Sequence, residues 1–467
     1  MNEILFQNAS PKIKALTNIL STAIKGSIFE NKVYYVGGCI RDMLLGLDVK
    51  DVDIAVDMPN GGILFAAYIC GLNKCVVDNK NPIVYSLYGT AKFQITSNDI
   101  VKNIVIECSQ TRKEKYTHDS NKPSISFASV EDDAKRRDLT INALYYNLST
   151  EKLHDYHHGI EDLSNMTIRT PSDPYATFYE DPLRILRAIR FSTMLGWDIE
   201  KDTWFAMIEN AKRIDIVSQE QVTQELNKIL LCDNPSIGIR RMYFCGILDK
   251  ILPDIYDLIS VKEQTNPSIS TFDHTMKVLD GVQPLIVNRL AALFHDVGKI
   301  VLSRIKASDI DNFSADVAQS ILMMMKYPKD IVESVHTVIK FHRGFGRFKD
   351  GELPPDKKIR KFINLTNNEF APTMDLMNNN NLYATFGKKP HQVLDILNRI
   401  EELGEMERKA NIKLPINGND IQKTLKIKEG KIIGILLKEL KEYYFENPKI
   451  TKEEALRFVK NQFALIL

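Results

Sequence analysis

The stretch YYVGGCIRDMLLGLDVKDVDIAVD, residues 34–57, decides the fold of the N-terminal part of the chain. A β-branched and aromatic run over 33–36 predicts a short strand, and the residues after the glycine pair predict a helix over 39–47. A second apolar run then contains Asp51 and Asp53. Because successive side chains of a strand point to opposite faces, these two carboxylates should project from one face.

This arrangement predicts a site for a triphosphate and magnesium. Two like charges held close together repel each other, and a bound cation is the usual reason to tolerate them. The backbone of Gly37 and Gly38 can approach a phosphate closely at the start of a helix. A turn followed by a strand with two solvent-facing aspartates is the better explanation of an isolated DVD triplet. The GGCIRD segment directly upstream favours the phosphate and metal site instead.

The composition is that of an ordinary soluble protein. A chain of 467 residues predicts about two to four domains. The formal net charge of +1 gives no overall signal for nucleic acid, so any RNA-binding surface has to be a local patch. The six cysteines contain no C-x-x-C pair and indicate reduced thiols. Without a signal peptide or a long apolar run, we expect a cytoplasmic protein that does not enter membranes.

Several segments around this stretch allow structural predictions. Residues 11–30 have the apolar spacing of a helix. Glu107 interrupts an apolar strand over 104–108, where it either points outward or forms a third carboxylate beside Asp51 and Asp53. Residues 111–130 and 151–175 are polar, contain prolines and lack periodicity, so both segments are predicted to be loops.

Two further motifs place charges ahead of apolar runs. Arg136, Arg137 and Asp138 are adjacent, and guanidinium groups bind phosphate in a bidentate way, although adjacent arginines are usually solvated surface. From residue 179 onward the pattern is helical, with Asp181 and Arg184 three residues apart on one predicted helical face. A simple salt-bridged helix is the alternative there.

Several separate motifs in order give the chain a family resemblance. GGCIRD with DVD, then RRDLTINAL, then EDPLRILRAIRF resemble the class II tRNA nucleotidyltransferases and the related bacterial poly(A) polymerases. The resemblance is strong over residues 33–231 and weaker as far as the C-terminus. It implies a nucleotidyltransferase sheet followed by a helical neck, an HD-like body and a tail.

The resemblance also implies roles for individual residues. Asp51 and Asp53 would be the catalytic carboxylates and would hold two Mg²⁺ ions, with Glu107 as the candidate for a third. The triphosphate cradle would be formed by Gly37, Gly38, Arg41 and Asp42. Arg137 and Asp138 would contact the ribose, and Glu180, Asp181 and Arg184 would recognise the base. The remaining nucleotide-binding candidates are Arg136, Asn142 and Arg187.

The chemistry of the bases independently suits the pair Asp181 and Arg184. Cytosine and adenine each place an amino donor beside a ring-nitrogen acceptor. A carboxylate that accepts and a guanidinium that donates therefore suit both bases, whereas uracil and guanine present the reverse order. Rejection of such a mismatch in a buried site can reach about 10⁴-fold or more.

The sequence departs from the family pattern in three places. Residues 119–123 read DSNKP, without the arginine of the family's Asp-Gly-Arg-like element, and Gln221 stands where relatives often have arginine. The HD-like region lacks the histidine expected in FSADVAQSIL and has asparagines in NNNNLYA, which are poor metal ligands. We expect an HD-like body that is not a competent phosphohydrolase. Its weak candidate ligands are His274, His295, Asp296 and His342.

Together these features predict an α+β enzyme with four parts. They are a catalytic head (1–150), a helical neck that binds the base and RNA (151–235), an HD-like body (236–390) and a helical tail that binds tRNA (391–467). The predicted reaction is template-independent addition of CCA to the tRNA 3′ end from CTP and ATP by two-metal nucleotidyl transfer with Mg²⁺. A poly(A) polymerase, a CC-adding or an A-adding enzyme remain alternatives. From other classes, an HD-type metal phosphohydrolase and a non-catalytic RNA-binding protein also remain; oligomeric state is not predicted.

Overall fold

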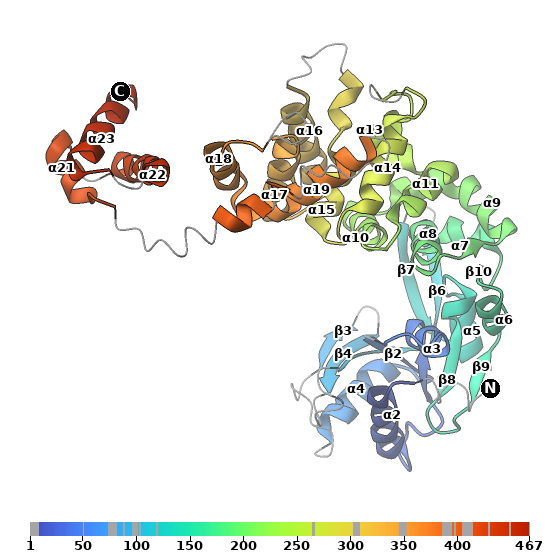
Figure 1. Ribbon diagram of the computed structural model, residues 1–467. Helices are drawn as coiled ribbons and strands as arrows, with labels where there is room; N and C mark the ends of the chain where they lie inside the picture. Colours follow the sequence, from blue (N-terminus) through green and yellow to red (C-terminus); the bar gives the residue numbers. More distant parts are fainter. Residues whose placement is uncertain are drawn as a thin grey trace. The chain divides into compact units, whose positions relative to one another are not determined.

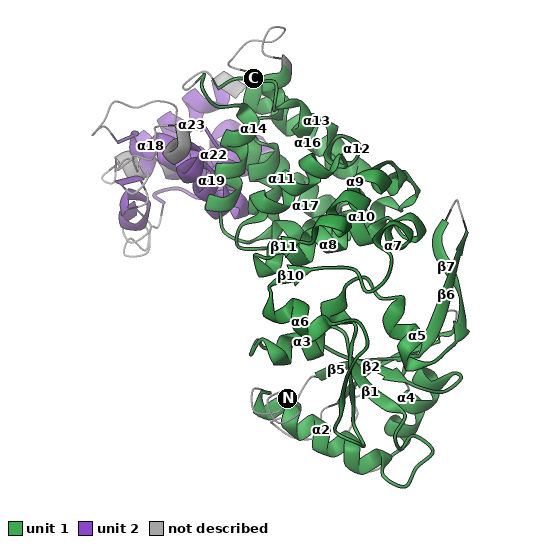
Figure 2. Ribbon diagram, turned by 90° about the vertical axis from the view of Figure 1, so that its right-hand side faces the viewer, with its two compact units in different colours: residues 1–340 green, residues 341–467 purple. Residues whose placement is uncertain are grey.

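The chain folds into two compact units, residues 1–340 and residues 341–467 (Figures 1 and 2). The predicted α+β class is confirmed, with a mixed sheet near the N-terminus and helices in the C-terminal part. No helix among the described residues is long and apolar enough to cross a lipid bilayer. The finer division at residues 150, 235 and 390 stays a prediction. The computed structural model describes residues 9–49, 51–72, 82–86, 89–95, 101, 104–117, 120–263, 267–301, 309–344, 353–384, 395–396, 398–403, 414–427, 430–447 and 450–466.

A mixed sheet of seven strands forms the N-terminal part of the first unit. Its strand order is β3-β4-β5-β2-β1-β8-β9, which makes β2 the central strand. β2 and β5 pair in parallel, and the other neighbouring strands are antiparallel. The strands are β1 (Val33–Val36), β2 (Asp51–Val56), β3 (Ile83–Tyr85), β4 (Thr90–Ile95), β5 (Ile104–Gln110), β8 (Leu144–Asn147) and β9 (Leu153–Asp155). The predicted strand over 33–36 is confirmed.

Helices cover both faces of this sheet (Figure 1). α4 (Gly61–Gly71) packs against β2, β4 and β5 on one face. On the other face, α5 (Val130–Lys135) buries apolar side chains against β1, β2 and β8. Ala55 belongs to that second cluster. Because side chains alternate along β2, Asp51 and Asp53 lie on the same face as Ala55 and α5.

Two helices flank the opening strand. α2 (Pro11–Ile24) begins at Ser10, whose Oγ accepts a hydrogen bond from the backbone N–H of Ile13 at 3.4 Å. α3 (Gly38–Leu44) connects β1 to β2. It is shorter than the predicted helix over 39–47 because the backbone turns at Gly46, which adopts a φ of +68°.

The prediction of a loop over 111–130 is wrong. β6 (Arg112–Thr117) and β7 (Ser120–Phe127) form a separate antiparallel hairpin that extends beside α5 (Figures 1 and 2). Exposure alternates along β6, so its charged and polar residues face the protein at every second position. The strand therefore has the period of two without an apolar face, because ion pairs take the place of apolar contacts.

The prediction of a loop over 151–175 is also wrong. This segment contains β9, α6 (Gly159–Ser164) and β10 (Thr167–Ile168), and it ends in the first residues of α7. The carboxylate of Asp155 accepts hydrogen bonds from the backbone N–H groups of Gly159 at 2.8 Å and Ile160 at 3.0 Å. A side chain thus satisfies the first donors of α6, which an apolar pattern does not reveal.

The rest of the first unit is helical, as the sequence predicted for residues after 179. Its α-helices are α7 (Pro174–Glu180), α8 (Leu183–Leu195), α9 (Lys201–Asn210), α10 (Gln219–Leu230), α11 (Pro235–Cys245), α12 (Leu248–Ile251), α13 (Pro253–Asp257), α14 (Thr271–Gly281), α15 (Ile286–Phe294), α16 (Ile310–Met324) and α17 (Lys329–Phe341). A short pair of parallel strands, β10 and β11 (Asp198–Ile199), lies among them.

The second unit contains two small apolar clusters. The first is formed by α18 (Asp356–Thr366), α19 (Phe370–Ala384) and the buried side chains of Ile396 and Leu403. The second is formed by α21 (Gly418–Leu425), α22 (Lys431–Glu446) and α23 (Lys452–Ile466). The predicted helices of the C-terminal tail are thereby confirmed.

Candidate active site

The predicted carboxylate pair lies on the central strand. Asp51 and Asp53 are both exposed and flank the buried Val52, so they share one face of β2 as predicted. Glu107 on β5 is the direct register partner of Asp53. Desolvation by the surrounding protein raises the pKa of the Asp53 carboxyl although its side chain still reaches solvent; Arg137 opposes this shift, while Glu107 and Asp51 add to it. The carboxylates of Asp51, Asp53 and Glu107 therefore lie close together on the neighbouring strands β2 and β5.

The glycine pair brings the backbone close to this place. Gly37 adopts a φ of +70°, which favours glycine. A Cβ atom at Gly37 would lie 3.2 Å from Asp53 Oδ2 and 3.2 Å from Arg137 Nη1. Glycine thus leaves the carboxylate and the guanidinium accessible beside the backbone at the start of α3.

A chain of hydrogen bonds connects the GGCIRD segment with the RRD segment. Arg41 donates from Nε to Asp42 Oδ1 at 2.8 Å and from Nη1 to Asn142 Oδ1 at 2.8 Å. Asn142 in turn donates from Nδ2 to Asp138 Oδ1 at 3.2 Å. The other oxygen of Asp138 accepts from Arg187 Nε at 2.8 Å. Residues far apart in the sequence therefore form one continuous hydrogen-bonded network.

This hydrogen-bonded network keeps Asp138 in its ionised form. Burial alone would raise the pKa of its carboxyl, but Arg187 and the hydrogen bond from Asn142 hold that pKa well below its usual range. Arg137 takes a different direction and donates from Nε to the hydroxyl of Tyr145 at 2.8 Å. Tyr145 donates in turn to the buried carboxylate of Asp133.

The pair proposed to recognise the base forms at a break between helices. The expectation of one continuous helical face is wrong, because Asp181 has extended backbone after α7 and Arg184 lies in α8. Arg184 Nε nevertheless lies 3.7 Å from Asp181 Oδ2. Burial raises the pKa of Asp181, against the charge of Arg184. Burial also raises the pKa of Glu180 at the end of α7.

Two neighbouring cavities of about 620 Å³ and 600 Å³ open on the carboxylates. They share Asp53, Lys92, Glu107, Arg137 and Arg187. Arg136 lines the smaller one only. The other predicted site residues that line the larger one are Gly37, Gly38, Arg41, Asp42, Asp51, Asp138 and Asn142. Among the described residues, Glu180, Asp181 and Arg184 line neither of these two cavities.

Some residues of this region escaped the sequence analysis. Lys92 on β4 is the cross-strand partner of Glu107 and lines both cavities. Glu114 and Tyr116 on β6 contact Arg184. The alternation of charged residues in RKEKYT was the available signal for β6, but the absence of apolar positions concealed it.

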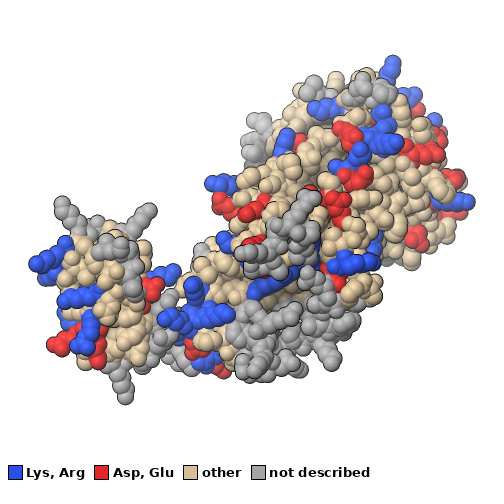
Figure 3. Space-filling view, turned by 90° about the horizontal axis from the view of Figure 1, so that it is seen from above, with Lys and Arg blue, Asp and Glu red and all other residues tan. Residues whose placement is uncertain are grey.

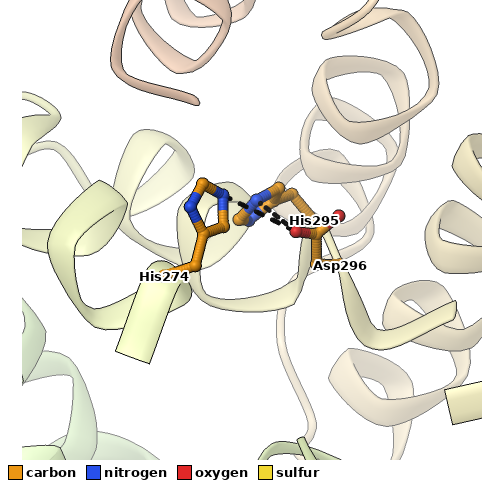
Figure 4. A group of neighbouring side chains, drawn as sticks. All are labelled: His274, His295 and Asp296. Atoms are coloured by element: carbon orange, nitrogen blue, oxygen red, sulfur yellow. Dashed lines mark ion pairs between the residues drawn. The ribbon is translucent and has the colours of Figure 1, made fainter. Parts of the chain in front are cut away.

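The HD-like candidates lie elsewhere in the first unit. His274 and His295 point their Nε2 atoms toward Asp296 Oδ2, at 3.7 Å and 3.1 Å (Figure 4). All three side chains are buried, and one ligand atom from each lies within 4.8 Å of the others. Burial and the neighbouring His295 lower the pKa of His274. His342 belongs to the second unit.

A lysine lies beside this group. The ammonium of Lys299 lies 2.7 Å from Asp296 Oδ2 and 2.9 Å from both carboxylate oxygens of Glu263. One ammonium is shared by two carboxylates, so it offsets only part of their negative charge. The side chains of His274, His295 and Asp296 could therefore still hold a metal ion.

Charge is mixed on one face of the molecule. Basic and acidic side chains are interspersed on the face shown in Figure 3. This agrees with the formal net charge of +1. A surface that binds the RNA backbone would have to be local.

Comparisons with known proteins agree with this geometry. Residues 33–169 match the family described as "Poly A polymerase head domain", and residues 196–258 match "Probable RNA and SrmB- binding site of polymerase A". The "Multifunctional CCA protein" of Chromobacterium violaceum is 31% identical over 70% of this chain and 78% of its own length. The "CCA-adding enzyme" of Ligilactobacillus salivarius is 28% identical over 95% of both chains.

The fold is also that of a solved relative. The Bacillus stearothermophilus CCA-adding enzyme in complex with CTP superposes with a TM-score of 0.66 at 19% identity, over 98% of this chain and 99% of that one. Fold and sequence together define a nucleotidyltransferase, a class that uses divalent metal ions. Within that class, the chain belongs to the family of class II CCA-adding tRNA nucleotidyltransferases.

Proposed function

We propose that this chain adds CCA to the 3′ end of tRNA without a nucleic-acid template, using CTP and ATP. The observation that supports this most directly is the group of Asp51, Asp53 and Glu107 on neighbouring strands beside a cavity of about 620 Å³. Family membership gives the class of reaction. The roles of individual residues below are part of the proposal.

The carboxylates fit magnesium. They offer only oxygen ligands, which Mg²⁺ prefers, and a cation would offset both the desolvation and the neighbouring negative charges that raise the pKa of Asp53. Asp51 and Asp53 would hold two ions, with Glu107 as a further ligand. Mg²⁺ held there would supply positive charge at the α-phosphate and at the RNA 3′-hydroxyl. The 3′-oxygen would form a bond to the α-phosphorus as the bond from that phosphorus to pyrophosphate breaks.

The basic residues around the cavity bind and orient the nucleotide. Lys92, Arg137 and Arg187 line the cavity together with the carboxylates and would pair with phosphate oxygens. Arg41 and Asp42 belong to the same lining, beside the accessible backbone of Gly37 and Gly38. The ionised Asp138, fixed by Arg187 and Asn142, would accept a hydrogen bond from a ribose hydroxyl.

Base choice rests on Asp181 and Arg184. The carboxylate accepts from the amino group of cytosine or adenine, and the guanidinium donates to the adjacent ring nitrogen. Uracil and guanine would meet two mismatches each. Because Arg184 is 7% exposed, an unpaired donor there is costly, which is the condition for strong discrimination.

The experiment that tests the reaction uses tRNA transcripts that end before CCA, at C and at CC. Each is incubated with a single nucleoside triphosphate and Mg²⁺, and the product length is measured. We expect C to be added twice and A once, with synthesis ending at CCA. Long A-tracts on unrelated RNA would identify a poly(A) polymerase instead. Addition of only C or only A would identify a partial enzyme.

Two sets of variants test the assigned residues. Asp51→Ala and Asp53→Ala should each abolish incorporation while leaving the thermal unfolding midpoint near that of the parent chain. Incorporation that survives both substitutions contradicts the mechanism. Arg184→Ala should reduce the preference for CTP over UTP; an unchanged preference would remove Arg184 as a base-recognition residue. Arg240→Ala is the control, since Arg240 is a half-exposed arginine paired with Asp273 in the first unit.

A further inference from the structure

One face of strand β6 is directed at Arg184. Exposure alternates along β6, with Arg112, Glu114 and Tyr116 turned inward and the lysines between them turned to solvent. The Glu114 side chain is only 5% exposed. Because a buried carboxylate is costly without partners, the partners of Glu114 indicate what the strand does.

Glu114 joins four side chains from three parts of the chain. Its Oε1 accepts from Arg112 Nε at 3.0 Å and from Arg136 Nη1 at 2.8 Å. Its Oε2 accepts from the Tyr116 hydroxyl at 2.7 Å and lies 3.5 Å from Arg184 Nη2. Burial would raise the pKa of Glu114, but the three arginines hold it below its usual range. The carboxylate is therefore ionised and firmly anchored.

Tyr116 extends this anchor to Arg184. Its hydroxyl donates to Glu114 and accepts a hydrogen bond from Arg184 Nη2 at 3.2 Å. Asp181 contacts the same guanidinium through Nε. None of these contacts uses Nη1. Arg184 is thus held along two of its nitrogens, from β6 on one side and from the end of α7 on the other.

We propose that Glu114 and Tyr116 are positioning residues that fix the guanidinium of Arg184 and thereby set how strictly the incoming base is selected. This inference rests on the proposed role of Asp181 and Arg184. Neither Glu114 nor Tyr116 needs to touch the nucleotide for this role.

The physical reason is the direction of the donor. A guanidinium held in one orientation presents its N–H to a ring acceptor, and a ring N–H of uracil then meets a donor that cannot turn away. An arginine free to rotate avoids that clash at little cost, so the wrong base is penalised less. Fixing the side chain also removes the entropy that binding of the correct base would otherwise cost. Loss of the anchor should therefore reduce selectivity more than it reduces the rate with the correct nucleotide.

The test is Tyr116→Phe, which keeps the ring and removes only the hydroxyl. Steady-state addition to tRNA lacking CCA is measured with CTP and with UTP, giving kcat and KM for each. We expect the ratio of kcat/KM for CTP over UTP to fall about tenfold or more, the effect of losing a hydrogen bond to a charged group. Glu114→Gln, which removes the charge with little change of shape, should lower the same ratio.

Lys115→Gln is the matched control, because Lys115 lies on the solvent face of the same strand. It should leave the ratio unchanged. A purely structural role of the anchor would lower the unfolding midpoint and the activity with both nucleotides while preserving the ratio, and that result would overturn the proposal. If Glu114→Gln fails to fold, Tyr116→Phe alone decides.

Arg184→Ala distinguishes the base-recognition role of Arg184 from its positioning by Glu114 and Tyr116. A relaxed ratio in Arg184→Ala with a normal ratio in Tyr116→Phe and Glu114→Gln would refute positioning and leave the base-recognition role intact. An unchanged ratio in Arg184→Ala would refute both. In the double variant Tyr116→Phe with Arg184→Ala, the ratio should equal that of Arg184→Ala, since the hydroxyl acts only through that arginine.

Discussion

Glu107 stands directly opposite Asp53 in the parallel pairing of β2 with β5. Lys92 stands opposite Glu107 on its other side, on β4. The sequence left two roles open for Glu107, an outward-facing residue or a third carboxylate. Its place beside Asp53, whose pKa it helps to raise, supports the second role.

We therefore expect Glu107→Gln to lower single-nucleotide addition on the order of 100-fold at limiting Mg²⁺, because one negatively charged ligand is lost. Higher Mg²⁺ should recover part of the activity. The measurement is a Mg²⁺ titration of single-turnover rate. Glu131→Gln, an exposed position in α5, is the control. Equal rates for Glu107→Gln and the parent chain at limiting Mg²⁺ would leave Glu107 without a role in catalysis.

Local patterns were enough to predict the centre of the sheet. The run over 33–36 and the alternation around Asp51 and Asp53 have the period of two that strand geometry imposes, and both are found as predicted. The position of the glycine pair beside the site was predictable because few residues other than glycine adopt the positive φ angle of Gly37. These features depend on residues close together in the sequence.

Features that depend on long-range pairing were not predictable. The hairpin β6–β7 has no apolar face, and its inward residues are stabilised by Arg136 and Arg184, the latter 68 positions from Tyr116. The pairing of Lys299 with Glu263 likewise joins residues 36 positions apart, whereas Lys299 and Asp296 are only three positions apart. No local period encodes a contact of that kind, so only the folded chain reveals it.

The ion pair of Asp138 with Arg187 predicts a pH-dependent contribution to stability. The pKa of Asp138 is depressed in the folded chain, so its stabilising effect is present above the ordinary aspartate pKa of about 3.9. It is lost as the pH falls through the lower folded pKa. Asp138→Asn should therefore lower stability at neutral pH by about 2 kcal/mol, the worth of a hydrogen-bonded charged group.

Thermal unfolding of Asp138→Asn and the parent chain between pH 8 and pH 3 measures this effect. The gap between the midpoints should be constant from about pH 8 to pH 5 and should narrow below about pH 4. A difference between the two midpoints that stays constant to the lowest pH would show that Arg187 and Asn142 do not lower the pKa of Asp138. Asp202→Asn, in the first turn of α9, is a matched aspartate outside this network.

Lys299 predicts a second, larger effect on stability. It pairs with the fully buried Asp296 and with Glu263, and Lys299→Met would leave both carboxylates without this cation. We expect a loss of about 3 kcal/mol, the usual cost of breaking a buried pair. Lys326→Met, which removes a lysine from an exposed pair with Glu220, should have little effect. Equal effects of the two substitutions would argue against compensation by Lys299.

The HD-like region predicts an absence of hydrolysis. Because FSADVAQSIL lacks the further histidine and NNNNLYA has asparagine where an aspartate would complete the ligand set, the parent chain should not hydrolyse a phosphomonoester such as p-nitrophenyl phosphate when Ni²⁺, Co²⁺ or Mn²⁺ is added. Ion-dependent hydrolysis that is lost in His295→Ala would contradict this expectation and restore the phosphohydrolase alternative. The readout is product absorbance, measured with CCA addition as the control for folded enzyme.

The packing of α4 on the sheet predicts opposite effects for two glycines of one helix. A Cβ atom at Gly62 would lie 2.6 Å from the backbone oxygen of Cys108 on β5, so alanine there would force the helix away from the strand next to Asp53. Gly62→Ala should cost about 1–3 kcal/mol. At Gly71 no atom lies within 4 Å of the added Cβ, and Gly71→Ala should be neutral or stabilise by up to about 1 kcal/mol. Thermal unfolding of both variants measures the contrast, and equal midpoints would show that close contact between α4 and β5 is not required for the fold of the catalytic sheet.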